Sequence, residues 1–155
     1  MEIKIVNLAE RLEYLDEVSE WFWHVWGGGQ TLENMHYTTV HTTQRDKVPL
    51  TYIALSGERL VGTVSLWMND LRCRQDLFPW LTNLYVREDI QDQGVDKLLQ
   101  DQMMVEALQL GYKDVFTIST TDYEYFEKTG WTFKELAPMN NGVMTRIYHK
   151  DLNVE

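Results

Sequence analysis

A short stretch around residues 84–97 places a strand, a glycine-bearing link and a helix in immediate succession. The apolar run 84–86 leads into a polar link that contains Gln91 and Gly94, and an apolar pattern typical of a helix follows. A strand that enters a helix through such a turn directs unpaired backbone N–H groups and the positive end of the helix dipole at one place. This arrangement suits an anionic ligand such as a pyrophosphate, although a single glycine does not by itself specify the ligand.

Aromatic and acidic side chains elsewhere in the chain could bind an organic cation. Trp21, Trp23 and Trp26 lie near the end of the first predicted helix, and aromatic faces attract cations. We predict that Trp23 and Trp26 are ligand contacts, with ordinary packing as the alternative. Asp70 and Asp122 lie in loop or strand-end positions where a general base or an amine-binding carboxylate would be useful, with solvated loop charges as the alternative.

The sequence contains no pattern of metal ligands or of paired thiols. Cys73 is the single cysteine, so an intramolecular disulfide is excluded. His24, His36 and His41 have neither metal-ligand spacing nor a nearby cysteine. We therefore expect no bound metal.

Composition and charge restrict the class of protein further. The chain has 155 residues, of which 44% are hydrophobic and 25% charged, which is typical of one globular domain over residues 1–155. Its formal net charge of −10 and the lack of a basic stripe argue against nucleic acid as a partner. No apolar run approaches the roughly 18 residues of a membrane span, and the first residues do not resemble a signal peptide. We therefore expect a cytoplasmic protein with no membrane association.

Hydrophobic periodicity predicts the elements that must position these residues. Steps of three and four indicate amphipathic helices, alternation or short apolar runs indicate strands, and glycines mark the turns between them. The resulting fold class is α/β in the α+β sense, with a mixed, mostly antiparallel central sheet, a parallel βαβ crossover and helices on both faces. Strands are predicted at 2–6, 50–55, 60–67, 80–86, 115–118, 131–136 and 143–148, and helices at 9–26, 32–43, after the polar link up to Gly111, and at 122–128.

Taken with its surroundings, the 84–97 stretch resembles the acetyl-CoA-binding motif of the GNAT N-acetyltransferase superfamily. The pattern of that motif is Gln or Arg, two residues, Gly, one residue, then Gly or Ala, and Gln91 and Gly94 match it. The Tyr-Phe-Glu-Lys-Thr-Gly-Trp segment at 125–131 also falls in the superfamily's order, and the segment 70–80 looks like that of a branch of small bacterial GNAT proteins. The resemblance covers nearly the whole chain and implies the GNAT fold, in which the parallel strand pair splays apart.

The resemblance also implies an activity and a set of site residues. The expected reaction is direct transfer of the acetyl group from acetyl-CoA, the co-substrate, to an amine of a small cationic acceptor. A backbone N–H would polarise the thioester carbonyl, and a carboxylate or water would take the amine proton. Asp122 and Tyr123 are the predicted catalytic residues, Tyr123 as a substitute for the family's proton donor and with packing as the alternative. Trp23, Trp26 and Asp70 are the predicted acceptor contacts. The predicted acetyl-CoA contacts are Leu84, Tyr85, Val86, Gln91, Asp92, Gln93, Gly94, Val95, Asp96 and Lys97.

Three residues depart from the superfamily's pattern. Asp92 and Asp96 stand where the family has small residues, and Phe126 stands where it often has a tyrosine that protonates the departing thiolate. We predict that the Asp96 carboxylate caps the free N–H groups of the following helix. These departures keep open an alternative function, a catalytically weakened GNAT-fold module that binds a ligand or a protein. Members of the family often pair, so a homodimer is also compatible with the resemblance.

Overall fold

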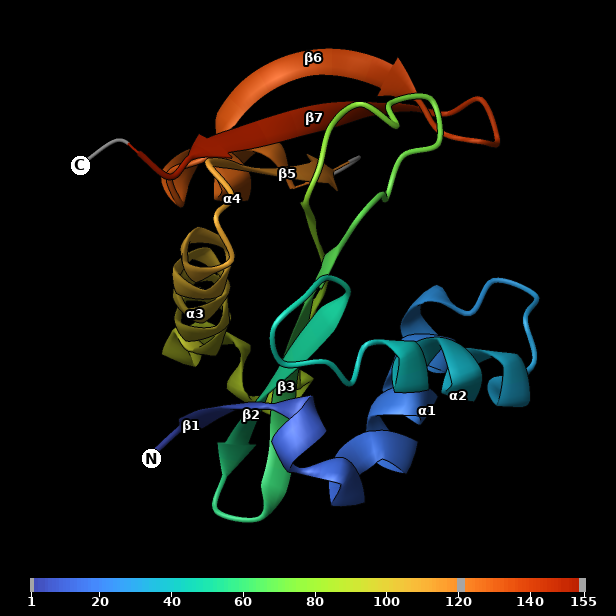
Figure 1. The fold of residues 1–155 in the computed structure, drawn as a ribbon, viewed down its shortest axis with the longest axis vertical. Helices are drawn as coiled ribbons and strands as arrows, with labels where there is room; N and C mark the ends of the chain where they lie inside the picture. Colours follow the sequence, from blue (N-terminus) through green and yellow to red (C-terminus); the bar gives the residue numbers. More distant parts are fainter. Residues whose placement is uncertain (1, 120–121, 154–155) are drawn as a thin grey trace.

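Apolar and β-branched runs build one mixed sheet in the computed structural model, which describes residues 2–119 and 122–153. The spatial order of the strands is β1-β2-β3-β4-β5-β7-β6 (Figure 1). Each neighbouring pair is antiparallel except β4 and β5, which are parallel. This arrangement confirms the predicted fold class. The strands are β1 (Lys4–Asn7), β2 (Leu50–Ser56), β3 (Arg59–Trp67), β4 (Trp80–Val86), β5 (Asp114–Ser119), β6 (Thr132–Pro138) and β7 (Met144–Asp151).

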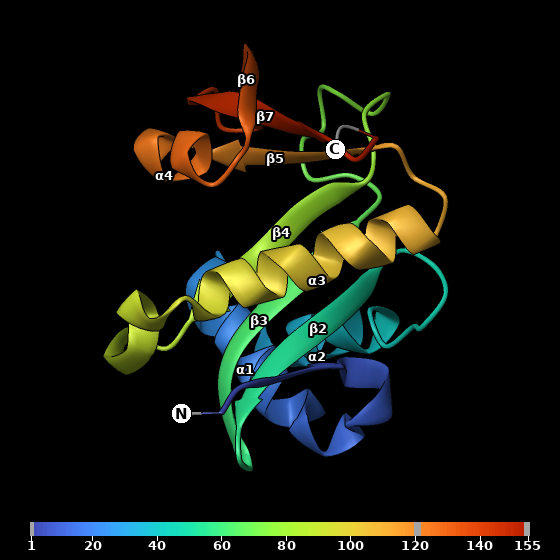
Figure 2. The same ribbon diagram turned by 90° about the vertical axis from the view of Figure 1, so that its left-hand side faces the viewer.

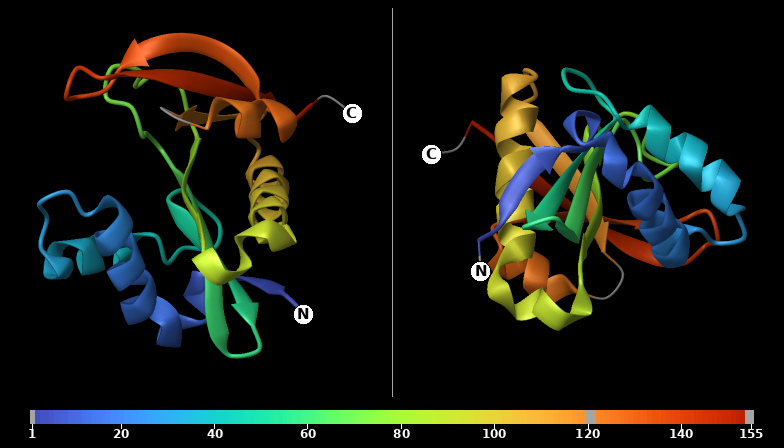
Figure 3. Two further views of the ribbon diagram at one scale, coloured as in Figure 1. Left: turned by 180° about the vertical axis from the view of Figure 1, so that it is seen from behind. Right: turned by 90° about the horizontal axis from the view of Figure 1, so that it is seen from below.

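The helices cover both faces of the sheet, as predicted. Helices α1 and α2 lie on one face and α3 lies on the other, which Figure 3 shows most clearly in the view from below. The short helix α4 lies beside the β5–β7 end of the sheet (Figure 2). The α-helices are α1 (Leu15–Trp26), α2 (Leu32–His41), α3 (Val95–Gln109) and α4 (Tyr123–Lys128). The short 3-10 segments are η1 (Leu8–Glu10), η2 (Leu12–Tyr14) and η3 (Glu88–Gln93).

The first helix is shorter than the predicted 9–26. The Asn7 side chain accepts a hydrogen bond from the Ala9 amide at 2.8 Å and starts η1. Arg11 then adopts a non-helical conformation with φ −137° and ψ 59°, so a second 3-10 turn precedes α1. Leu12 lies in the apolar stripe of the predicted helix 9–26 and is therefore expected on its buried face. In the structure it is 55% exposed. The local cap at Asn7 therefore overrides the longer helical pattern.

Strand β2 divides its side chains between two layers of core. Leu50 and Ala54 face the cluster that α3 covers, whereas Ile53 and Leu55 face the cluster beneath α1. On the α3 side, Gly62 of β3 allows a close approach, because a Cβ there would lie 2.9 Å from the Leu99 Cδ1 atom. Helix α3 therefore packs tightly against the central strands.

Strands β4 and β5 separate soon after they meet. Within the described residues, their register contains the single pair Trp80 and Phe116. The Phe116 amide donates to the Pro79 carbonyl at 3.0 Å, and the Thr117 hydroxyl donates to the Leu81 carbonyl at 2.9 Å. Beyond these bonds the strands diverge, as Figure 2 shows. We call the Trp80 side of this pair the closed end and the Val86 side the open end.

Candidate active site

A bulge in β4 marks the point where the strand leaves β5. The register with β3 pairs Thr63 with Tyr85 and Ser65 with Thr82, so β4 uses one residue more than β3 over this interval. Asn83 has the left-handed φ of 53°, and its carbonyl accepts a hydrogen bond from the Thr63 hydroxyl at 2.8 Å. An extra residue bends its strand and increases the local twist. The bulge thus turns the second half of β4 away from β5.

After the bulge, hydrogen-bonding directions still alternate along β4. This alternation decides which backbone groups of β4 face the gap that opens between β4 and β5, which we call the splay. The Arg87 amide donates to the Val61 carbonyl of β3 at 2.9 Å. Because hydrogen-bonding directions alternate along a strand, the backbone groups of Leu84 and Val86 point to the opposite side, where β5 has moved away. Of the predicted acetyl-CoA contacts, Leu84 therefore offers its N–H and carbonyl to the splay, whereas Val86 offers its N–H, because its carbonyl already accepts from the Gln91 side chain. The backbone of Tyr85 faces β3 instead, so the structure does not bring it to the splay with its neighbours.

The link after β4 ends in a helix start without a side-chain cap. Gly94 has φ 77°, a left-handed conformation that glycine adopts without strain, and among the described residues no side chain caps α3. The first N–H groups of a helix have no partner within it, so those at the start of α3 are available to an anion. The side-chain amide of Gln91 donates to the Val86 carbonyl at 3.1 Å and ties the link to β4.

The other predicted contacts of this link differ in their surroundings. Asp92 and Gln93 are exposed, whereas the Val95 side chain is fully buried in the core. The Lys97 ammonium pairs with Asp101, one turn later on the exposed face of α3, at 2.8 Å. Within the described part of the chain, the loop thus has unpartnered backbone N–H groups at the start of α3, and the Lys97 ammonium already has a carboxylate partner.

The structure contradicts the predicted capping role of Asp96. Its carboxylate accepts a hydrogen bond from the Tyr125 hydroxyl of α4 rather than from the N–H groups of α3. The physical reason is that α4 lies beside the start of α3 and offers an O–H donor there. Asp96 is therefore drawn toward α4.

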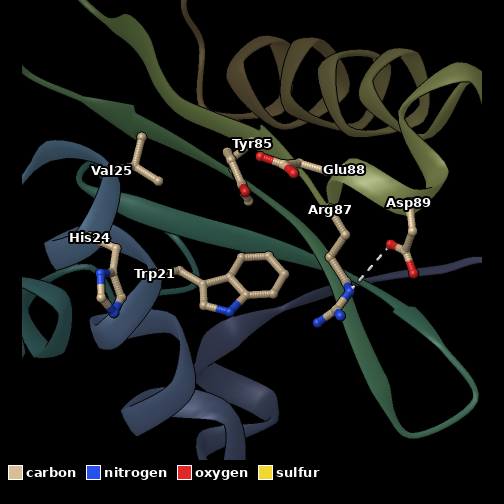
Figure 4. Close-up of a pocket in the computed structure, with 7 residues that line it drawn as sticks. All are labelled: Trp21, His24, Val25, Tyr85, Arg87, Glu88 and Asp89. Atoms are coloured by element: carbon tan, nitrogen blue, oxygen red, sulfur yellow. Dashed lines mark ion pairs between the residues drawn. The ribbon is translucent and has the colours of Figure 1, made fainter.

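An open pocket lies on the other side of β4, against α1. The Tyr85 ring meets the edge of Trp21 with ring centroids 5.5 Å apart, and Trp26 lies 6.4 Å from the same ring. The pocket has a volume of about 480 Å³. Figure 4 shows the Trp21 indole reaching from α1 toward β4. The lining residues are Trp21, His24, Val25, Tyr85, Arg87, Glu88 and Asp89.

The rim of this pocket carries charges of both signs. Asp89 binds the Arg59 guanidinium at 2.7 Å and lies 3.5 Å from the Arg87 Nε atom. The hydrogen bond from Arg59 holds the pKa of Asp89 below its ordinary value. Glu88 adds a second acid to the lining. Aromatic faces beside carboxylates form a suitable environment for an organic cation.

The tryptophans of α1 take different positions from those predicted. The Trp23 indole N–H donates to the Gln30 carbonyl at 2.7 Å, and Trp23 is not among the described residues that line the pocket. Trp26 contacts the ring of Tyr85, whereas Trp21, which the sequence analysis did not select, forms the wall. The spacing i, i+3, i+4 of Trp21, His24 and Val25 puts them on one helix face and could have identified them.

Asp70 lies at a second, smaller pocket beside the turn between β6 and β7. This pocket has a volume of about 260 Å³ and is lined by Asp70, Leu71, Arg72, Met139, Asn140 and Asn141. Asp70 is an exposed residue, yet the surrounding loops remove enough water from its carboxylate to raise its pKa to about 6, and a hydrogen bond with Thr82 opposes this rise. The structure thus brings Asp70 to a pocket, but on a different part of the surface from Trp21.

The predicted catalytic residues lie where β5 passes into α4. The Asp122 amide donates to the Ser119 hydroxyl at 3.0 Å. The Arg146 guanidinium lies 3.8 Å above the ring of Tyr123, which begins α4. Phe126 stacks on Tyr148 with centroids 5.3 Å apart. Asp122 and Tyr123 therefore follow the carboxyl end of the strand that splays from β4, an edge at which ligands of open α/β sheets commonly bind.

The family of the chain follows from a comparison of its sequence with family models. Residues 15–131 match the model of the acetyltransferase (GNAT) family, and the chain therefore belongs to this family. This result confirms the resemblance seen in the sequence and makes the protein an acetyltransferase with acetyl-CoA as its co-substrate. A search of curated proteins finds no match to the chain.

Solved structures share the fold at low sequence identity. A crystal structure of an aminoglycoside 6'-N-acetyltransferase complexed with coenzyme A superposes with a TM-score of 0.77 at 14% identity, covering 100% of this chain and 99% of the other. The aminoglycoside 6'-N-acetyltransferase from Enterococcus faecium gives 0.72 at 15% identity, with coverage of 100% and 99%. A GNAT-family acetyltransferase from Streptococcus pneumoniae gives 0.65 at 19% identity, with coverage of 97% and 99%.

Over residues 2–119 and 122–153, none of the helices combines the length and apolar character that a bilayer span requires. In the same part of the chain, no group of three or more His, Cys, Asp or Glu side chains is arranged to hold a metal ion.

Proposed function

We propose that the protein is an N-acetyltransferase that moves the acetyl group of acetyl-CoA to an amine on a small cationic molecule. One observation carries the proposal: consecutive residues of β4 present groups to opposite sides of the strand. The backbone groups of Leu84 and Val86 face the splay, whereas the side chain of Tyr85 enters the pocket against α1. The two reactants would therefore approach the same short segment from opposite sides.

The residues present fit the co-substrate. Leu84 and Val86 would hold the pantetheine through their backbone groups, and the uncapped N–H groups after Gly94 would hold the diphosphate. When bound, acetyl-CoA supplies an acetyl group activated as a thioester. The bulge at Asn83 leaves the Leu84 amide on the splay side, where a backbone N–H can polarise a carbonyl oxygen.

The pocket against α1 supports a cationic acceptor. Trp21 and Tyr85 provide aromatic surface, and Glu88 provides a carboxylate, whereas Asp89 is already paired with Arg59. The net charge of −10 adds a long-range attraction for cations. The aminoglycoside acetyltransferases with the same fold act, according to their names, on polycationic amines. We propose that the acceptor is a small amine with at least one further positive charge.

Asp122 and Tyr123 are our proposed proton-transfer residues. Both follow the carboxyl end of β5, at the edge toward which the splay opens. An amine must lose a proton as it attacks, and the leaving thiolate gains one, so a carboxylate and a hydroxyl at this edge could serve these needs. Asp70 and Trp26 remain candidates for additional contacts to a larger acceptor.

A second candidate function, a weakened module that binds without efficient transfer, is favoured by the packing of Phe126. Its ring is stacked on Tyr148 and meets Trp131 edge-on. Phenylalanine has no hydroxyl, so this position packs against the core and cannot protonate a thiolate. The two functions are distinguished by calorimetry with CoA followed by a thiol-release assay across polyamines, aminoglycosides, amino acids and peptide amines. Thiol release that depends on one class of amine supports the transferase. CoA binding without release from any amine would favour the weakened module.

Two tryptophan variants locate the acceptor site. Trp21→Ala removes a wall of the pocket, and we expect the KM for the acceptor to rise about tenfold with little change in the CoA affinity, since a buried cation–aromatic contact contributes about 1 to 2 kcal/mol. Trp23→Ala removes an indole that bonds Gln30 outside the pocket. Steady-state kinetics in which only Trp23→Ala raised the KM would restore the sequence-derived assignment and overturn the structural one.

A further inference from the structure

Helix α3 carries two carboxylates that each accept a hydrogen bond from a tyrosine hydroxyl. Near the end of α3, Glu106 is bonded by Tyr52 of β2 at 2.8 Å. At its start, Asp96 is bonded by Tyr125 of α4. The first pair lies under the helix, where Glu106 is only 7% exposed. The second pair lies beside the loop that would hold the diphosphate of acetyl-CoA.

The hydrogen bonds around Tyr125 can run in only one direction. Trp131 has a donor and no acceptor on its indole, and it donates to the Gln100 Oε1 atom at 2.9 Å. The amide nitrogen of Gln100 is then left to donate to the Tyr125 oxygen. Tyr125 has one proton, which it must give to Asp96. Because Gln100 and Trp131 are both buried, this chain of donors fixes the Tyr125 hydroxyl toward the carboxylate.

The position of Asp96 explains why its orientation matters. Asp96 lies in the first turn of α3, two residues after Gly94, where free N–H groups and the helix dipole attract any anion. An unrestrained carboxylate there would compete with a phosphate for these groups and would also repel it. At about 5 Å and an effective dielectric near 20, such a repulsion corresponds to a loss of affinity on the order of a hundredfold per unit charge.

We propose that Tyr125 is a positioning residue for acetyl-CoA, whose hydroxyl holds the Asp96 carboxylate against α4 and so leaves the start of α3 free for the diphosphate. The inference rests on the proposed function and adds to it a role for α4 in binding the co-substrate. It also explains how a chain with aspartate in place of glycine or alanine keeps this site usable.

The test is a double-mutant cycle read by calorimetry with CoA. Tyr125→Phe removes only the hydroxyl, and we expect it to raise the Kd of CoA about tenfold, as the released carboxylate turns toward the N–H groups. In the Asp96→Asn background, the same change should alter the Kd by less than about twofold, because no charge is released. The effect in the natural background should also shrink as the ionic strength is raised.

Tyr52→Phe provides the matched control. It removes the same atom from the other tyrosine–carboxylate pair of the same helix and leaves the buried Glu106 without this donor. Unfolding in urea should show a loss of stability for Tyr52→Phe, while its Kd for CoA should equal that of the unaltered protein. A rise in Kd of similar size for both tyrosine variants would indicate a general loosening of α3 and would overturn the inference.

The remaining outcomes separate this inference from the proposed function. If the unaltered protein binds CoA and Tyr125→Phe raises the Kd equally with Asp96 or Asn at position 96, or does not raise it at all, Tyr125 has no positioning role, although the transferase assignment stands. If the unaltered protein does not bind CoA, the proposed function itself fails, and the inference fails with it.

Discussion

The closed and open ends of the β4–β5 pair show two uses of one strand. At the closed end, β4 has a neighbour on each side, because Trp80 pairs with Trp67 of β3 and with Phe116 of β5. At the open end, after the bulge at Asn83, only β3 remains as a partner. Backbone groups that lack a strand partner must bond to a side chain, to water or to a ligand, and the Val86 carbonyl accepts from the Gln91 side chain. A sheet thus creates a binding surface where it gives up a neighbour.

The side chains at the closed end are more deeply buried than those at the open end. Trp80 at the closed end is fully buried and packs against Phe116 with centroids 5.8 Å apart. At the open end, Trp26 is 39% exposed and Tyr85 lines a pocket. The closed end therefore contributes stability, and the open end contributes surface for binding. Three predictions test this division.

The largest expected effect is on stability at the closed end. Trp80→Ala removes a fully buried indole whose N–H donates to the Leu77 carbonyl, and we expect a loss of about 3 to 5 kcal/mol of unfolding free energy. Trp26→Ala makes the same deletion at the open end and should cost about 1 kcal/mol or less. Urea unfolding of both variants would contradict the division if the two losses were equal.

A smaller effect is expected from the loop at the open end. Gly94 and Gly57 both have left-handed φ angles, 77° and 61°, and a Cβ on either would meet no atom within 4 Å. Replacing either glycine by alanine should therefore lower the free energy of unfolding by about 1 kcal/mol through backbone strain. Only Gly94→Ala should also raise the Kd of CoA, since Gly57 lies in the distant turn between β2 and β3. Equal Kd values for the two variants would show that the geometry of Gly94 is not needed for CoA.

The smallest effect concerns Asp70, which precedes the closed end. Asp70 is exposed as a whole residue, but its carboxylate loses enough water in the folded protein to raise its pKa from 3.8 to about 6. The folded protein therefore holds this proton more tightly than the unfolded chain does. The stability that this proton contributes is present at low pH and is lost as the pH rises from about 4 through about 6. Asp70→Asn should remove this pH-dependent loss of unfolding free energy. A fully buried group would give roughly 1.4 kcal/mol for each unit of pKa shift, and the loss here should be well below that because the residue is exposed to solvent.

Unfolding curves of both proteins at a pH of about 4 and of about 8 measure this difference. The quantity to compare is the change in stability between the two pH values, because the substitution itself also alters a hydrogen bond with Thr82. A fall of the same size in Asp70→Asn would assign the pH dependence to another group. In that case the closed end would hold no titrating acid.

Prediction from the sequence succeeded where the information was local in the chain. The alternation and helical stripes placed the strands and helices in their observed order, and Gly94 marked the turn before α3. The motif residues Gln91 and Gly94 indicated acetyl-CoA as the co-substrate, in agreement with the family of the chain. The start of the first helix was wrong because the cap at Asn7 and the conformation of Arg11 interrupt a pattern that is otherwise periodic.

Prediction failed where the information lies between elements distant in the chain. The sequence analysis assigned Asp96 to its own helix, whereas its partner Tyr125 is 29 residues away. Trp23 and Trp26 were predicted as acceptor contacts from their three-residue spacing, and they stay predictions. Only the packing of α1 against Tyr85 shows that Trp21 lines the pocket whereas Trp23 bonds to Gln30. Which backbone groups of β4 face the splay also depends on a bulge that the residue pattern does not show.

Taken alone, the amino-acid sequence determined the elements, their order and the family, because hydrophobic periodicity and short motifs act over a few residues. Tertiary structure alone decided which backbone groups of β4 face the splay, which tryptophan lines the pocket and which hydroxyl bonds to Asp96. These outcomes depend on the orientation of one element against another. That orientation is set by packing across the whole sheet, and no local pattern encodes it.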